Sequence, residues 1–142
     1  MKQITVLLAD DNKIVRREFR RILELEDDLK VVGEANNGRQ AVAMVKKLRP
    51  ALVLMDLVMP VLNGLEATRQ ILKAAFATKV LMLSAHSDDA YVQEAMNAGA
   101  MGYLIKHTSA ARVCPALREV HKGNTYFSPS IPSRLRKPNR KN

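Results

Sequence analysis

The sequence predicts an α/β fold, in which one parallel sheet of five strands is covered by helices on both faces. Apolar runs of six or seven residues alternate with longer segments in which apolar residues recur at helical spacing. The runs are almost continuously apolar, which is typical of strands buried on both faces of a parallel sheet. Five strand–helix repeats follow one another, so we expect a doubly wound (βα)5 sheet with right-handed crossovers.

The five predicted strands are ITVLLA, LKVVGEA, ALVLMD, KVLMLSA and MGYLIK, at residues 4–9, 29–35, 51–56, 79–85 and 101–106. The first helix is predicted over 13–26, with a core face formed by Val15, Phe19, Ile22 and Leu23. Its arginines Arg16, Arg17, Arg20 and Arg21 lie largely outside that face. The second helix is predicted over 39–50, with Ala41, Met44, Val45 and Leu48 at core spacing.

Residues that cap helices mark the boundaries of these segments. Asp11 or Asn12 can cap the first helix, Asn63 the third, and Ser87 or Asp88 the fourth, which Gly99 ends. The last helix lies within 109–123, where Pro115 interrupts the pattern. Because proline inside a helix costs about 3 kcal/mol, we expect that helix to begin at or near Pro115 and 108–114 to be irregular.

Length and charge suggest one domain with a short appendage. Of the 142 residues, 23 are Lys or Arg and 14 are Asp or Glu, and residues 122–142 hold six of the bases and none of the acids. From residue 128 on, three prolines and no periodicity predict a basic linker or disordered tail over 128–142. We favour the linker over a nucleic-acid arm, since the end of this segment has no aromatic residue to stack on bases.

Other classes of protein are disfavoured. The single cysteine cannot form an internal disulfide, which favours a reducing cytosol. No run approaches 18 apolar residues, so no membrane span is expected. The phosphate-binding patterns G-x-x-x-x-G-K-[ST] and G-x-G-x-x-G are absent from the sequence, so nucleotide binding has no support.

Polar residues end four of the five predicted strands. Asp10 and Asp11 follow the first strand, Asp56 ends the third, Ser84 the fourth and Lys106 the fifth. Each alone has an ordinary explanation as a cap, a turn residue or a solvated lysine. Together they should meet at one edge, because the carboxyl ends of parallel strands share it. Three close carboxylates need a cation, and Mg²⁺ suits their hard oxygens.

A carboxylate with a metal ion, a lysine and a hydroxyl around it is suited to phosphoryl transfer, with Asp56 as the nucleophile. Phosphatases of the haloacid dehalogenase type also use a strand-end aspartate. Their second aspartate comes two residues later, where this chain has Val58. That difference disfavours a phosphatase that turns over substrate.

Four segments resemble the receiver domains of two-component response regulators. They are LLADDN, LVLMDLVMPVLNG, VLMLSA and GAMGYLIK, at 7–12, 52–64, 80–85 and 99–106. The resemblance covers about residues 3–127 and implies a flavodoxin-like sheet in the order 2-1-3-4-5. GYLIKHT and GNTYFSPSI further resemble the NarL/FixJ (LuxR-type) group, whose receivers precede a helix-turn-helix domain. We expect a receiver at 1–127 without that output domain, in a chain that is either truncated or a natural stand-alone receiver.

The resemblance implies a role for each motif residue. Asp56 would be the phosphoacceptor, and Ser84 and Lys106 would contact the phosphoryl group. Asp10, Asp11, Asp56 and the backbone carbonyl of Val58 would hold Mg²⁺, and Ser84 and Tyr103 would form the switch. For Tyr103, a strand residue with a solvated hydroxyl is the alternative. Apolar Val58 predicts a phosphoryl group that persists for minutes, while His86, also beside the site, can equally be a plain surface residue.

These roles imply a cytoplasmic signalling module that is not an enzyme with turnover. A sensor histidine kinase would phosphorylate it, and the output would be transcription, with DNA bound only through the absent domain and a homodimer left open. The alternatives are a stand-alone receiver that acts by protein–protein interaction and a protein that binds DNA through its basic tail. Most receivers follow the lysine with proline, where this chain has His107. We expect a trans bond there and a local shift of the loop.

Overall fold

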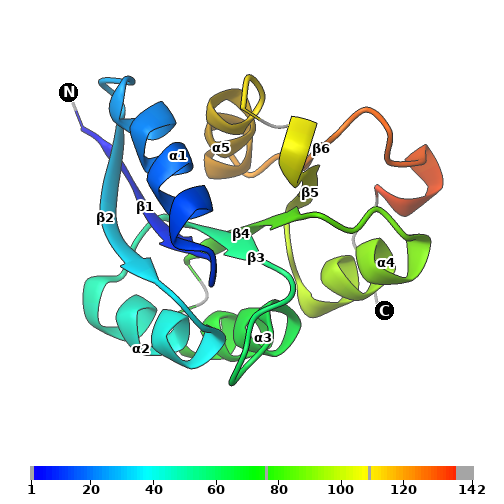
Figure 1. The fold of residues 1–142 in the computed structure, drawn as a ribbon, viewed down its shortest axis with the longest axis horizontal. Helices are drawn as coiled ribbons and strands as arrows, with labels where there is room; N and C mark the ends of the chain where they lie inside the picture. The colour runs from blue at the N-terminus through cyan, green and yellow to red at the C-terminus, as the bar shows by residue number, and fades with distance from the viewer. Residues whose placement is uncertain (1, 76, 109, 137–142) are drawn as a thin grey trace.

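One parallel sheet organises the protein. In the computed structural model, which describes residues 2–75, 77–108 and 110–136, six strands are paired in the order β2-β1-β3-β4-β5-β6 (Figure 1). The strands are β1 Ile4–Ala9, β2 Leu29–Ala35, β3 Leu52–Asp56, β4 Lys79–Ser84, β5 Gly102–Ile105 and β6 Tyr126–Phe127. The predicted α/β fold and the order 2-1-3-4-5 are confirmed, and the short strand β6, which was not predicted, pairs in parallel with β5.

Five helices cover the two faces of the sheet. They are α1 Lys13–Glu24, α2 Gly38–Leu48, α3 Gly64–Ala74, α4 Asp89–Ala98 and α5 Val113–His121. Helices α2, α3 and α4 lie on one face, and α1 and α5 on the other (Figure 1). Strand β1 serves both layers, since Leu7 and Ala9 join the first cluster and Val6 and Leu8 the second. The sheet is therefore buried on both faces, as the apolar runs predict.

The helix boundaries follow from the capping residues. Asn12, Asn37 and Asn63 each accept backbone N–H groups of the first turn of α1, α2 and α3. Gly99 ends α4 with a φ of 106°, a conformation that glycine adopts without strain. Leu48, expected in the core, is 39% exposed because it is the last residue of α2 and the chain turns away at Arg49.

Pro115 is the third residue of α5, two residues after the helix begins. Backbone N–H groups in a first helical turn have no acceptor within the helix, so the missing proline N–H costs little there. The predicted start near Pro115 is confirmed, whereas the expectation that 108–114 is irregular is wrong for Val113 and Cys114, which already belong to the helix. The chain before the helix forms a 3₁₀ turn over Lys106–Thr108, directly after β5.

Residues 128–136 fold back onto the domain beside α4. Ile131 and Leu135 are buried in the same apolar cluster as the α4 side chains, and a 3₁₀ turn spans Ser133–Leu135. Arg136 donates to the carbonyls of Ile131 and Pro129. This part of the segment is packed rather than disordered, because its apolar residues reach the edge of the core. A linker role for 128–142 stays a prediction, and 137–142 lie outside the described residues.

Candidate functional site

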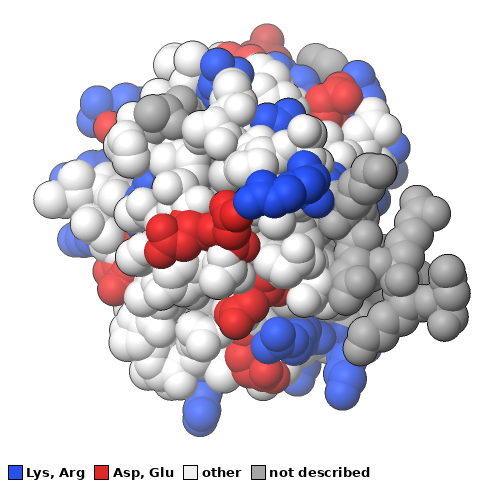
Figure 2. Space-filling model, turned by 90° about the vertical axis from the view of Figure 1, so that its right-hand side faces the viewer, with Lys and Arg blue, Asp and Glu red and all other residues white. Residues whose placement is uncertain are grey.

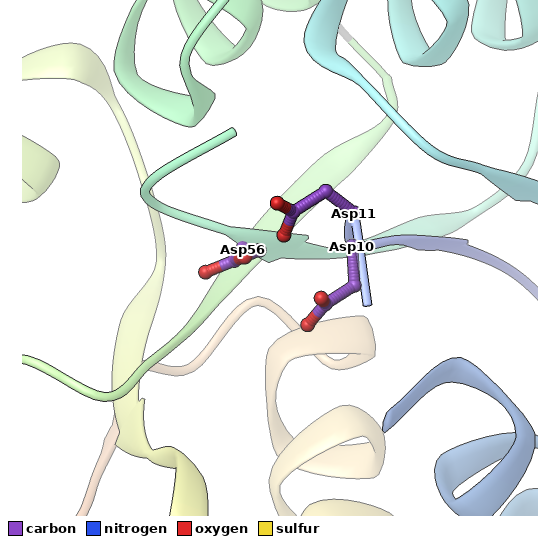
Figure 3. A group of neighbouring side chains, drawn as sticks. All are labelled: Asp10, Asp11 and Asp56. Atoms are coloured by element: carbon purple, nitrogen blue, oxygen red, sulfur yellow. The ribbon is translucent and has the colours of Figure 1, made fainter. Parts of the chain in front are cut away.

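Three carboxylates meet at the carboxyl ends of two neighbouring strands. Asp10 and Asp11 follow β1, and Asp56 ends β3, which pairs directly with β1. Oxygens of the three side chains lie within 4.8 Å of one another (Figure 3). Asp10 and Asp56 are buried, whereas Asp11 is exposed at the mouth of the group. The predicted convergence of these aspartates at one sheet edge is thus observed.

Lys106 brings a positive charge to the same point from the end of β5. Its Nζ lies 2.8 Å from Oδ2 of Asp10 and 3.4 Å from Oδ2 of Asp56. The expected trans bond before His107 is observed, since the described residues contain no cis peptide bond. Burial lowers the pKa of Lys106, but the contact of its ammonium with the Asp10 carboxylate and the charge of Asp56 raise it above its ordinary value overall. The lysine is therefore charged at neutral pH.

One ammonium does not balance the carboxylates. Burial, and then the charge of Asp10, raise the pKa of Asp56 from 3.8 to about 7, although Lys106 acts in the opposite direction. A carboxyl group with such a pKa is only partly ionised near neutral pH. The pocket is therefore short of positive charge, and an added cation would favour the ionised form of Asp56.

Asp10 is held so that one of its oxygens remains available. Its Oδ1 accepts the backbone N–H of Asn12 at 2.8 Å. Its Oδ2 is buried and forms no hydrogen bond of good geometry, with the Lys106 ammonium as its charged neighbour. Carboxylate oxygens with few other partners suit Mg²⁺, which binds through one or two carboxylates and keeps several waters. The residues of this pocket therefore fit a divalent cation.

The loop after Asp56 is tightly folded beside the pocket. Leu62 N–H donates to Pro60 O at 2.7 Å around Val61, whose φ of 71° is strained for a β-branched residue. Gly64 begins α3 against the Asp56 carbonyl, where a Cβ atom would lie 2.1 Å from the oxygen. The side chain of Val58 is half exposed. This loop carries the Val58 carbonyl predicted as a metal ligand.

Ser84, which ends β4, and Tyr103, the second residue of β5, are both fully buried. The Ser84 hydroxyl accepts the backbone N–H of His86 at 3.0 Å, and the Tyr103 hydroxyl donates to the carbonyl of His86 at 2.6 Å. The alternative of a solvated tyrosine hydroxyl is therefore wrong for this structure. His86 is an exposed residue whose ring packs on Tyr91 of α4, 4.9 Å between centroids.

The contacts of two residues beside the site were not predicted from the sequence. Arg16 of α1 reaches the backbone at Asp10, and Ser128 bonds the strand that carries Lys106. The Ser128 hydroxyl accepts the N–H of Ile105 at 2.8 Å, and its own N–H donates to Tyr103 O at 3.0 Å. Neither residue belongs to the four segments that resemble receiver domains, although Ser128 lies in GNTYFSPSI, and no spacing rule connects them to the strand ends.

Comparison with known proteins agrees with this geometry. The family model described as "Response regulator receiver domain" matches residues 6–118. The chain is 37% identical over 139 residues to the transcriptional regulatory protein DegU of Brevibacillus brevis, covering 98% of this chain and 59% of that protein. It is 39% identical over 133 residues to the response regulator protein VraR of Staphylococcus aureus, covering 94% and 64%. The chain thus spans about three fifths of the length of these relatives.

Solved structures give the same result. A LuxR-family two-component response regulator from Aurantimonas superposes with a TM-score of 0.87 at 33% identity, covering 92% of this chain and 93% of the other. The receiver domain of a response regulator NarL from Mycobacterium tuberculosis superposes with a TM-score of 0.84 at 31% identity, covering 87% and 100%. With its acidic pocket and its lysine, the chain belongs to the response regulator receiver domains, the phospho-accepting signalling modules of two-component systems.

Proposed function

We propose that a sensor histidine kinase phosphorylates this domain on Asp56, with Mg²⁺ held by Asp10, Asp11, Asp56 and the Val58 carbonyl. The observation that carries the proposal is the position of Asp56, a buried carboxylate at a strand end between Asp10 and the Lys106 ammonium. Its pKa of about 7 indicates a pocket that needs more positive charge before Asp56 ionises fully. A bound Mg²⁺ would supply that charge and neutralise phosphoryl oxygens.

The chemistry follows from the residues at the pocket. A carboxylate oxygen of Asp56 attacks phosphorus, the bond from phosphorus to the histidine nitrogen breaks, and the imidazole leaves with the electron pair and takes up a proton. Lys106 faces Oδ2 of Asp56 and would stabilise the charge of the transferred group. The product is an acyl phosphate on Asp56. No other protein group has to change its covalent bonds.

We propose that Ser84 and Tyr103 report this event to the rest of the domain. Both contact the backbone of His86, which precedes α4, so a movement of Ser84 toward new phosphoryl oxygens would break its bond to the His86 N–H. Tyr103 is buried in the structure, and its hydroxyl holds the other side of the same residue. The equilibrium between the two arrangements would be the output signal.

We further propose that the output is transcription, exerted through a DNA-binding domain beyond the residues of this chain. Relatives with transcriptional names, such as DegU, support this. Direct DNA binding by the basic tail has less support, because Arg134 pairs with Asp89 and Arg136 donates to backbone carbonyls. On the face shown in Figure 2, basic and acidic side chains are interspersed, and uncharged surface surrounds these small groups. None of the helices described here is both long and apolar enough to cross a membrane.

The test is intact-mass analysis after incubation with acetyl phosphate. With Mg²⁺, the wild-type chain should gain about 80 Da, the mass of one phosphoryl group, and without Mg²⁺ it should not. Asp56→Asn should gain nothing under either condition. Asp28→Asn is the matched control, since Asp28 lies in a different ion cluster with Arg118 and should label as wild type does. Undiminished labelling of Asp56→Asn would overturn the assignment.

A further inference from the structure

Arg16 links the acidic pocket to the neighbouring strand. Although the helical pattern places it outside the core face of α1, its side chain is only 13% exposed. Nη1 donates to the carbonyl of Asp10 at 2.6 Å, and Nε donates to Oε1 of Glu34 at 3.0 Å. One guanidinium thus reaches both the loop after β1 and the end of β2. A planar fork of donors is needed to serve two acceptors in this way.

The carbonyl that Arg16 holds belongs to the peptide bond between Asp10 and Asp11. Because a peptide unit is planar, fixing this carbonyl fixes the direction in which the Asp11 Cα leaves Asp10. The N–H of Asp10 is fixed as well, since it donates to Ala35 O at 3.0 Å. Asp11 itself is exposed, and its side chain has little packing to orient it. The Arg16 hydrogen bond therefore sets how the two carboxylates are presented to the pocket.

Glu34 holds the arginine in place. Its Oε1 accepts from Arg16 and its Oε2 from Arg20 at 2.8 Å, so both carboxylate oxygens are used. Burial raises the pKa of Glu34, but the hydrogen bonds from Arg20 and Arg16 lower it by more. The pKa of Glu34 therefore lies below its ordinary value. The charge of Arg16 is therefore balanced by Glu34, which reduces its repulsion of a cation in the pocket.

We propose that Arg16 is a positioning residue for the cation site, acting through the Asp10–Asp11 peptide and not through contact with the ion or the phosphoryl group. The proposal rests on the proposed function of the pocket as an Mg²⁺-dependent phosphoacceptor site. It has a clear rival. An arginine this close to three aspartates can also act as a competing positive charge, in which case its removal would strengthen Mg²⁺ binding.

The experiment measures Mg²⁺ affinity of the full chain by titration followed through backbone amide NMR signals. Loss of an outer partner of a metal ligand typically weakens metal binding 10- to 100-fold. We expect Arg16→Gln to weaken Mg²⁺ binding about tenfold by this mechanism. Arg20→Gln is the matched control, because Arg20 shares Glu34 but does not reach Asp10. Its Mg²⁺ affinity should stay within about twofold of wild type, since the Arg16 hydrogen bond to Asp10 remains.

A second variant separates position from charge. Arg16→Lys keeps the positive charge but lacks the fork that spans Asp10 O and Glu34, so it should also bind Mg²⁺ several-fold more weakly. Phosphorylation by acetyl phosphate adds a further readout. Raising the Mg²⁺ concentration should restore most of the labelling rate in both Arg16 variants, because the nucleophile and Lys106 are unchanged.

Each outcome decides the question. Tighter Mg²⁺ binding by Arg16→Gln would overturn the proposal in favour of the competing charge. Unchanged affinity in both Arg16 variants, with only a lower melting temperature, would overturn it in favour of a simple structural brace. Either result leaves the proposed function intact if wild type binds Mg²⁺ and labels on Asp56. A wild-type chain that neither binds Mg²⁺ nor labels would instead overturn the proposed function, and the positioning role with it.

Discussion

Two clusters in this domain combine carboxylates with one cation, and they behave in opposite ways. In the first, Lys106 faces Asp10 and Asp56 inside the pocket, with Asp11 at its mouth. In the second, Arg118 of α5 binds Glu26 and Asp28 of the loop between α1 and β2. The pKa of Asp56 is raised to about 7, whereas the hydrogen bond from Arg118 lowers the pKa of Asp28.

The difference comes from burial and from the shape of the cation. The side chains of Asp10 and Asp56 are 6% and 7% exposed, so both lose water and share one compact ammonium. Asp28 is 30% exposed and receives two hydrogen bonds from the Arg118 fork, at 2.8 and 2.9 Å. One cation also faces two carboxylates in the second cluster, but there the excess negative charge is partly exposed to water, whereas in the first cluster it is buried. Buried carboxylates with excess negative charge favour a cation site, and partly exposed ones that accept an arginine fork act as a brace between elements.

The largest effect should follow removal of the Lys106 ammonium from the pocket. Breaking a buried ion pair by deleting one partner costs about 3–5 kcal/mol. We expect Lys106→Met to lower the free energy of unfolding by about 3 kcal/mol at pH 8 in Mg²⁺-free buffer. At pH 5 the loss should be smaller, because Asp56 is then mostly protonated. Urea unfolding followed by circular dichroism measures both values.

The control for Lys106→Met is Lys122→Met, which removes an exposed lysine paired with Glu119 on the surface. Its effect should be within about 0.5 kcal/mol at either pH. A loss for Lys106→Met that is the same at pH 5 and pH 8 would mean that packing of the lysine stem, and not its charge, stabilises the pocket.

A smaller effect of opposite sign is expected from neutralising Asp56. Its folded pKa of about 7 exceeds the ordinary 3.8, so the folded state binds more protons between these values and wild-type stability falls as pH rises from about 4 to 7. A pKa difference of about three corresponds to at most roughly 4 kcal/mol. We expect Asp56→Asn to be about 2 kcal/mol more stable than wild type at pH 8 without Mg²⁺, because Lys106 keeps a partner in Asp10.

The pH profile is the decisive part of this measurement. The stability gain of Asp56→Asn should disappear as pH falls toward 4, where Asp56 is already protonated in the folded chain and carries no buried charge. Mg²⁺ should stabilise wild type more than the variant, since the variant lacks one of the three carboxylates. A gain that persists unchanged at pH 4 would show that burial of the charge is not its cause.

The sequence predicts the pocket well because strand ends in a parallel sheet share an edge. Asp10, Asp56 and Lys106 follow apolar runs that are easily recognised, and their convergence needs only the sheet topology. The strand order itself came from the family resemblance, since alternation of strands and helices does not determine it. The contacts of Arg16 with Asp10 and Glu34 were not predicted, because helical periodicity assigns a residue to a face but does not show where a long side chain bends.

The C-terminal segment was harder to predict for a different reason. Strand β6 has two residues, which is too short for any periodic signal. Ile131 and Leu135 lie among prolines, serines and basic residues, a composition typical of linkers. Their burial depends on the surface offered by α4, which is a tertiary property. Tyr103 shows the same limit, because the partner of its buried hydroxyl is the His86 carbonyl, which no sequence pattern indicates.

The smallest effect should come from the exposed cluster. Exposed ion pairs contribute about 0.2–1 kcal/mol, and they weaken with salt. We therefore expect Arg118→Gln to lower the free energy of unfolding by about 1 kcal/mol at low salt and by less at 1 M NaCl. Asp28→Asn should lower the free energy of unfolding by less than Arg118→Gln does, because Glu26 still pairs with the arginine.

The sign of the pH dependence distinguishes the two clusters in one set of unfolding curves. Since the pKa of Asp28 is lowered on folding, the stability that its pair supplies is present above pH 4 and is lost as pH falls below it. As pH falls into the acid range, the free energy of unfolding of wild type should thus decrease relative to that of Asp28→Asn. Over the same range it should increase relative to that of Asp56→Asn. Equal slopes for the two variants would mean that one cation stabilises the ionised form of the buried carboxylates as well as that of the partly exposed ones. The pocket would then have no electrostatic need for a divalent ion.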